Sequence, residues 1–229
     1  MTLNGPVGVY FLLAYLVGSI PTGTIAARLQ GKGSLFAPGE RSPLKAGEVF
    51  EILGIPVGLL VTFLDFLKGL IVVWPLHDWL INTHDQDHWW VVSVGAFLVV
   101  FGHCNSAWLG FKGGRGLSTT FGVMMYLLPV PAVLAFLLWG CLAFWGLSTR
   151  PGALSAAGAM PLLSLPYVWW FRADKFELLM LVALLSLLTL WEYRAALLGY
   201  LGLPKKPSLP PSDSATASEQ RPDHPDTSS

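Results

Sequence analysis

Residues 102–122 read GHCNSAWLGFKGGRGLSTTFG and form a short polar interruption between two apolar segments. The centre of this stretch combines two cations and three glycines with a following hydroxyl group: Lys112, Gly113, Gly114, Arg115, Gly116 and Ser118. Glycines let backbone N–H groups approach a ligand closely, and the N–H groups and dipole at the start of a helix attract an anion. The composition favours a phosphate-binding loop, although its spacing is not that of a P-loop. The alternative is a flexible basic loop that only sets membrane topology.

The chain around this loop is too apolar for a soluble protein. Of its 229 residues, 53% are hydrophobic and only 12% are charged. A bilayer is crossed by about 20 consecutive apolar residues in a helix, and segments of this kind recur along the chain. The sequence therefore predicts an all-α polytopic membrane protein over residues 1–203. Residues 204–229 are rich in Pro, Ser, Asp and Thr, and we expect this polar tail to be disordered.

The apolar segments predict about seven transmembrane helices, some of them short or broken. Residues 28–51 form a polar connection in which prolines and glycines indicate turns rather than a continuous helix, and residues 77–90 form a second loop rimmed by tryptophans. The long segment 119–147 is divided into two helices by Pro129 and Pro131. The other expected spans are residues 7–27, 55–76, 91–104, 153–171 and 176–193.

The distribution of basic residues predicts the orientation. Lysine and arginine gather in loops on the cytoplasmic side of a membrane. Most of them here lie in residues 28–45, 112–115 and 194–206, whereas only Arg172 and Lys175 fall on the other side. We therefore expect the amino terminus outside the cell and the carboxyl terminus in the cytoplasm.

Two further features interrupt the apolar segments. Asp65 and Lys68 share one face of the second span at i, i+3 and can pair there. Ionisable groups at that depth are costly, so each is a candidate functional residue, with a purely structural ion pair as the alternative. Gly18–Gly23, GSIPTG, opens the backbone inside the first span or provides small residues for helix packing.

Several kinds of chemistry find no support. A net charge of zero gives no argument for nucleic-acid binding. Cys104 and Cys141 have no CxxC spacing, and the histidines and aspartates of residues 77–90 fit no standard metal site. There is also no GxSxG signature of an activated serine. We expect neither a metal nor an organic cofactor.

Three of these features, in this order, resemble the bacterial integral-membrane acyl-phosphate:glycerol-3-phosphate acyltransferase family. They are GSIPTG at residues 18–23, DxxKG at residues 65–69, and Gly102-His103 followed by FKGGRG at residues 111–116. The resemblance implies a helical protein of the bacterial inner (cell) membrane. It also implies a reaction in which an acyl phosphate donates its fatty acyl group to the 1-hydroxyl of sn-glycerol 3-phosphate, giving lysophosphatidic acid and phosphate.

The resemblance implies roles for particular residues. On it we expect the catalytic residues to be Ser19, Arg41, Ser42, Lys68 and His103. We expect the substrate or its phosphate to be bound by Lys45, Asp65, Lys112, Gly113, Gly114, Arg115, Gly116 and Ser118. His103 can exchange a proton near neutral pH, with a structural histidine at a helix end as the alternative. The implied partners are acyl phosphate, glycerol 3-phosphate and the lipid bilayer.

Two motifs depart from the family pattern. The family carries RxxGSGNxGATN in its first loop, where residues 37–48 here read APGERSPLKAGE, with Arg41, Ser42 and Lys45 as possible replacements. The family's carboxyl-terminal RHxxN becomes EYRAA, with Tyr193 at the His position and Ala196 at the Asn position. The alternatives are therefore a divergent acyltransferase and an inactive paralogue that binds acyl phosphate or lipid, or regulates an active acyltransferase. A small-solute transporter is a third, although no inverted repeat supports it.

Overall fold

The computed structural model describes residues 4–32, 46–83, 88–145, 149–173 and 175–201. Within these residues every regular element is a helix. In chain order the helices are α1 Asn4–Ser19, α2 Thr22–Leu29, α3 Ala46–Leu53, α4 Ile55–Thr83, α5 Trp89–Cys104, the 3-10 turn η1 Ala107–Leu109, α6 Leu117–Leu127, α7 Pro129–Phe144, α8 Thr149–Phe171, α9 Phe176–Glu192 and α10 Arg194–Tyr200.

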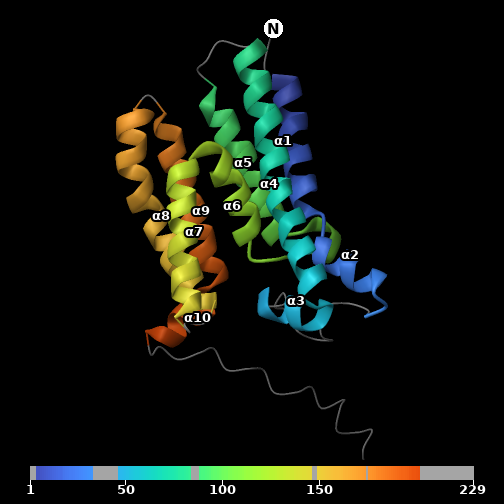
Figure 1. The fold of residues 1–229 in the computed structure, drawn as a ribbon. Coiled ribbons are helices and arrows are strands. Elements are labelled where there is room, and N and C mark those ends of the chain that lie inside the picture. The colour runs from blue at the N-terminus through green and yellow to red at the C-terminus, as the bar shows by residue number, and fades with distance from the viewer. Residues whose placement is uncertain (1–3, 33–45, 84–87, 146–148, 174, 202–229) are drawn as a thin grey trace, which may run out of the picture.

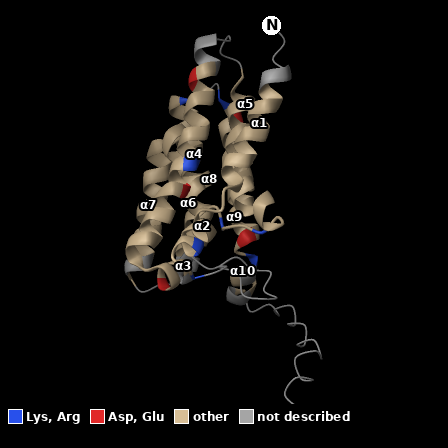
Figure 2. Cartoon of the chain, turned by 90° about the vertical axis from the view of Figure 1, so that its right-hand side faces the viewer, with Lys and Arg blue, Asp and Glu red and all other residues tan. Residues whose placement is uncertain are grey.

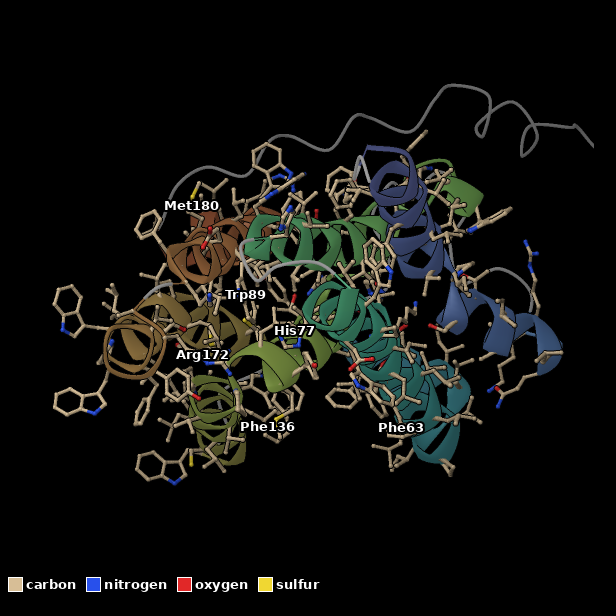
Figure 3. The ribbon with its side chains drawn as sticks, turned by 90° about the horizontal axis from the view of Figure 1, so that it is seen from above. Phe63, His77, Trp89, Phe136, Arg172 and Met180 are labelled. Atoms are coloured by element: carbon tan, nitrogen blue, oxygen red, sulfur yellow. The ribbon has the colours of Figure 1, made fainter. Side chains whose placement is uncertain are left out.

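The long helices lie side by side in a bundle (Figure 1). Helix α1 packs along α5, α4 along α6, and α8 lies between α7 and α9. The short helices α2, α3 and α10 lie at the end of the bundle opposite the amino terminus. Apolar side chains such as Phe63 and Met180 are exposed on the outside of the bundle in the view from above (Figure 3). An apolar exterior of this kind suits contact with lipid.

Two helical segments, Ile55–Trp79 and Trp89–Leu109, are each long and apolar enough to cross a membrane. Val7–Ser19 and Thr22–Leu29 together make a third candidate span that bends by 41° between its two parts. Leu117–Leu127 and Pro129–Leu142 are shorter apolar helices. The break predicted near Pro129 is confirmed, because α6 ends at Leu127 and α7 begins at Pro129.

The first span, residues 7–27, is broken within the GSIPTG motif as one of the two interpretations predicted, because Pro21 lacks the N–H that a continuous helix needs, and the chain bends there. Two other predicted boundaries were wrong. Residues 46–51, predicted as the end of a polar connection, belong to the helix α3, whose last residue, Leu53, is buried against Ala27 and Val61; the predicted turns at Pro38, Gly39 and Pro43 lie outside the described residues. The second span continues past residue 76 to Thr83, so residues 77–83 are helix rather than loop. A proline within it, Pro75, is tolerated because packing with neighbouring helices holds the segment in place.

Glycines bring two helix pairs into backbone contact. A Cβ added at Gly18 would collide with the Val99 carbonyl group, and one at Gly102 would collide with the Tyr15 carbonyl oxygen. These contacts join α1 to α5. The packing interpretation of the first-span glycines therefore holds for Gly18.

The second glycine contact joins α4 to α6. A Cβ at Gly69 would collide with the Thr119 carbonyl oxygen, and one at Gly122 with the Phe66 carbonyl oxygen. The contact fixes the helix that carries Asp65 and Lys68 against the helix that follows the glycine-rich loop.

The predicted polar tail, residues 204–229, lies outside the described residues.

Candidate functional site

A pocket of about 150 Å³ lies at the end of the bundle where α1 gives way to α2. Its polar wall comes from the Ser19–Thr24 segment, from Thr62 and Asp65 on α4, and from the residues that follow α5. Residues 113–118, which lead into α6, complete it together with Tyr193. An apolar part of the wall is formed by Ile20, Val49, Phe50, Val61, Leu109 and Leu117. The pocket thus combines a polar lining with an apolar one.

Asp65 is the centre of the polar wall. Its Oδ1 accepts a hydrogen bond of 2.6 Å from the Thr22 hydroxyl and pairs with the Lys68 ammonium at 2.7 Å. Nδ1 of His103 lies 3.6 Å from the same oxygen. Burying a charge is costly unless it is paired and hydrogen-bonded, and both conditions are met for Asp65.

Lys68 lies behind this wall and is not among the residues that line the pocket. Its Nζ donates to the Ile20 carbonyl oxygen at 2.7 Å and lies 3.5 Å from Nδ1 of His103, in addition to its pairing with Asp65. The helix break at Pro21 places that carbonyl group where Lys68 reaches it. An ammonium group has three donors, and Lys68 has three partners within the protein. The arrangement favours a structural ion pair over direct contact with a substrate.

His103 contacts the glycine-rich loop through both its backbone and its ring. The Gly114 N–H donates to the His103 carbonyl oxygen at 3.0 Å. A Cβ at Gly114 would collide with Nε2 of His103, and one at Gly113 with the His103 carbonyl oxygen. Both glycines are therefore required by close approach to α5 rather than by flexibility. The loop is held in one position relative to Asp65 through His103.

The glycine-rich loop leads into the first residue of α6 at the pocket. Gly116 is the N-cap with φ +75°, a value that glycine adopts without strain, and Leu117 is the first helical residue. Gly116, Leu117 and Ser118 all line the pocket. The first N–H groups of a helix have no partner within it, and with the helix dipole they attract an anion. Among the lysines and arginines that the structure describes, Arg115 alone lines the pocket, so it adds the positive charge.

A pocket whose lining attracts anions thus lies in a helical bundle whose sequence also matches a known family. Residues 8–201 match the family described as Glycerol-3-phosphate acyltransferase. The chain belongs to the glycerol-3-phosphate acyltransferase family. The family and the enzyme class predicted from the three motifs are confirmed.

Curated members of the acyltransferase family are similar over most of the chain. The glycerol-3-phosphate acyltransferase of Listeria welshimeri is 34% identical over 188 residues, which cover 80% of this chain and 87% of that protein. The enzyme of the same name from Sulfurimonas denitrificans is 31% identical over 159 residues, 66% of this chain and 74% of its own.

Two crystal structures of PlsY (YgiH), an integral membrane glycerol 3-phosphate acyltransferase, share the fold. The lysophosphatidic acid form matches with a TM-score of 0.70 and the glycerol 3-phosphate form with 0.71. Each is 27% identical and covers 86% of this chain and 93% of the solved chain. The predicted all-helical polytopic membrane fold is therefore confirmed.

The structure brings most of the predicted site residues of this acyltransferase together. Those that line the pocket are Ser19, Asp65, His103, Gly113, Gly114, Arg115, Gly116 and Ser118. Lys68 lies behind the wall, and Lys112 is exposed and does not line the pocket. Arg41, Ser42 and Lys45 lie outside the described residues.

Sequence reasoning missed two hydroxyl groups of the wall. Thr22 holds Asp65, and Ser106 donates to the Ser19 carbonyl oxygen. Thr22 lies within the GSIPTG motif, so a polar residue directly after an intramembrane proline was an available signal. Ser106 contacts a residue 87 positions earlier, which no local pattern indicates.

Proposed function

We propose that this acyltransferase moves a fatty acyl group from acyl phosphate to the 1-hydroxyl of sn-glycerol 3-phosphate. The products are lysophosphatidic acid and inorganic phosphate. The observation that carries the proposal is the convergence of Arg115 and the amino-terminal end of α6 on one pocket. The similar protein PlsY (YgiH) was crystallised in a glycerol 3-phosphate form and in a lysophosphatidic acid form, which supports glycerol 3-phosphate as the acceptor.

The chemistry suits a site without a protein nucleophile. The acceptor hydroxyl oxygen attacks the acyl carbonyl carbon, the bond from that carbon to the phosphate oxygen breaks, and the phosphate leaves with the electron pair. The hydroxyl proton ends on the departing phosphate, which leaves as hydrogen phosphate as the new ester forms. Because phosphate is already a good leaving group, the protein contributes mainly by positioning both substrates and stabilising negative charge. The guanidinium of Arg115 and the first N–H groups of α6 supply such stabilisation.

Ser19 is our candidate for a direct polar contact with substrate. Its side chain is fully buried, and its Oγ has no hydrogen-bond partner among the described residues. A buried hydroxyl without a partner costs free energy, and a substrate oxygen in the pocket would satisfy it. Lys68 and His103 act instead through Asp65 and Gly114, by keeping the loop in position.

We infer that the pocket faces the cytoplasm from the inner membrane of a bacterium. Lysine and arginine gather at the end of the bundle that carries α2, α3 and α10 (Figure 2). Arg172 and Lys175 lie between α8 and α9, at the other end of the bundle. This asymmetry is that of a cytoplasmic pocket end. The apolar lining, including Phe50 and Val61, would then receive the first carbons of the acyl chain.

The alternative is an inactive relative that binds acyl phosphate or lipid, or that regulates an active paralogous acyltransferase. It is favoured by Tyr193 and Ala196, which occupy the positions where the family motif RHxxN has His and Asn. An inactive relative would keep a phosphate pocket and form no product.

The decisive experiment is acyl transfer by the purified, detergent-solubilised protein. Palmitoyl phosphate and radiolabelled glycerol 3-phosphate are supplied, and labelled lysophosphatidic acid is measured. Arg115→Ala should lower kcat/KM at least about 100-fold, because it removes a charge-assisted contact to phosphate. Lys112→Ala is the matched control, since it removes a cation from the same loop but outside the pocket, and should keep nearly full activity. A folded, monodisperse wild type that forms no product would contradict the proposal and favour the inactive relative.

A further inference from the structure

Tyr193 is fixed between two helices and faces the pocket. Only 4% of the residue is exposed, and it lines the pocket at the junction of α9 and α10. Its N–H donates to the Thr189 carbonyl oxygen at 3.0 Å, and its own carbonyl oxygen accepts from the N–H groups of Ala196 and Leu197 at 2.9 and 3.0 Å. The backbone of Tyr193 is thus held on both sides, and burial of the residue restricts the space that its ring can occupy.

The guanidinium of Arg115 lies over the ring of Tyr193. The Arg115 Cζ lies 4.7 Å from the ring centroid, within the range of a cation–π contact. Arg115 is flanked by Gly114 and Gly116, so no neighbouring side chain in the loop restrains it. A free arginine side chain has high conformational entropy, and an aromatic face that holds it lowers the cost of ordering it around a ligand.

A second arginine makes a similar contact with an aromatic ring outside the pocket. Arg194 stacks on the ring of Trp191 at 4.6 Å, and its Nη1 donates to the Trp191 carbonyl oxygen at 2.7 Å. Both residues are exposed and neither lines the pocket. The two pairs have nearly the same distance from the guanidinium carbon to the ring centroid, but only Arg115 and Tyr193 line the pocket. The Arg194–Trp191 pair is therefore an internal control.

We propose that Tyr193 is a positioning residue for phosphate binding, which acts by holding the Arg115 guanidinium in the pocket. The proposal rests on the proposed function, because it takes Arg115 to be the group that meets a substrate phosphate. The ring face is the part of Tyr193 that matters here.

The test is a double-mutant cycle with Tyr193→Leu and Arg115→Ala, read by two methods. The first is the KM for glycerol 3-phosphate in acyl transfer. The second is the Kd for glycerol 3-phosphate and for inorganic phosphate from calorimetry in detergent. Tyr193→Leu should raise KM and Kd about tenfold, while Tyr193→Phe and Trp191→Leu should stay within about twofold of the wild type. In the Arg115→Ala background, Tyr193→Leu should cause no further change.

Three results would overturn the inference. One is a Tyr193→Leu effect that is just as large without Arg115, because a purely structural role is additive. Another is a loss in Tyr193→Phe equal to that in Tyr193→Leu, because it would assign the effect to the hydroxyl group. The third is a wild type that binds neither phosphate compound. If Tyr193→Leu does not fold, Tyr193→Met takes its place, since it keeps an apolar side chain without a ring face.

The binding measurements separate this inference from the proposed function. A wild type that binds glycerol 3-phosphate but forms no lysophosphatidic acid would refute acyl transfer. The cycle on Kd would still decide whether Tyr193 acts through Arg115.

Discussion

Two histidines lie at opposite ends of the bundle in different surroundings. His103 lies beside Asp65 and Lys68 and supports Gly114 of the loop. His77 shares a hydrogen bond of 2.8 Å between its Nδ1 and the Tyr126 hydroxyl, and its ring lies 4.7 Å from that of Trp89. Figure 3 shows His77, Trp89 and Arg172 near one another toward the middle of the bundle.

The difference between the two ends lies in what is buried. At the pocket end a carboxylate and an ammonium group are both almost fully buried and depend on each other. At the other end a hydrogen bond and tilted or edge-on aromatic rings lie beside two cations, with Arg172 at 5.8 Å and Lys175 at 5.5 Å from the centre of the Trp89 ring. Buried charge is costly to retain and aromatic packing is not, so the comparison favours the pocket end as the site of the proposed function.

The largest effect is expected from Lys68→Met. It leaves the Asp65 carboxylate buried without its cation, and we expect a loss of about 3–5 kcal/mol in the free energy of unfolding. Thermal unfolding in detergent measures this loss. Adding Asp65→Asn should restore part of the stability, because the unpaired charge is then gone. If Lys68→Met instead folds with wild-type stability and is inactive, Lys68 contacts the substrate itself.

Gly114→Ala should have a smaller effect on stability and a clear effect on activity. The new methyl group collides with Nε2 of His103, so either the loop or the ring must move. We expect the KM for glycerol 3-phosphate to rise about 10- to 100-fold, more than kcat falls. Gly140→Ala is the matched control, because nothing lies within 4 Å of a Cβ at that position. Unchanged kinetics in Gly114→Ala would show that the loop is not part of the substrate-binding site.

Tyr126→Phe should have the smallest effect. It removes the hydrogen bond to His77 at the end without the pocket and should cost about 1 kcal/mol of stability. Acyl transfer should stay at the wild-type rate. A tenfold loss of activity in a folded Tyr126→Phe protein would show that the two ends are coupled. It would contradict the claim that activity depends on the pocket end alone.

Much of the fold follows from local patterns. The apolar segments locate the helices, Pro129 divides α6 from α7, and the spacing of Asp65 and Lys68 predicts their pairing. The glycine-rich loop was recognisable because its composition is unusual between apolar segments.

The rest depends on contacts between distant residues. Thr22 meets Asp65 across 43 positions, and Arg115 meets Tyr193 only because α9 ends beside the loop. The burial of Leu53 that makes residues 46–53 helical also depends on α2 and α4. Lys112 and Arg115 are both cations of the glycine-rich loop, yet only Arg115 of the two lines the pocket.

The most direct test of the assignment of function to the pocket end is the affinity for glycerol 3-phosphate, measured by calorimetry on three proteins in the same detergent. Arg115→Ala should bind at least about tenfold more weakly than the wild type, because it loses the pocket cation. Arg172→Gln, which removes a cation from the opposite end, should bind as the wild type does. Wild-type affinity in Arg115→Ala, or an equal loss in Arg172→Gln, would contradict the account.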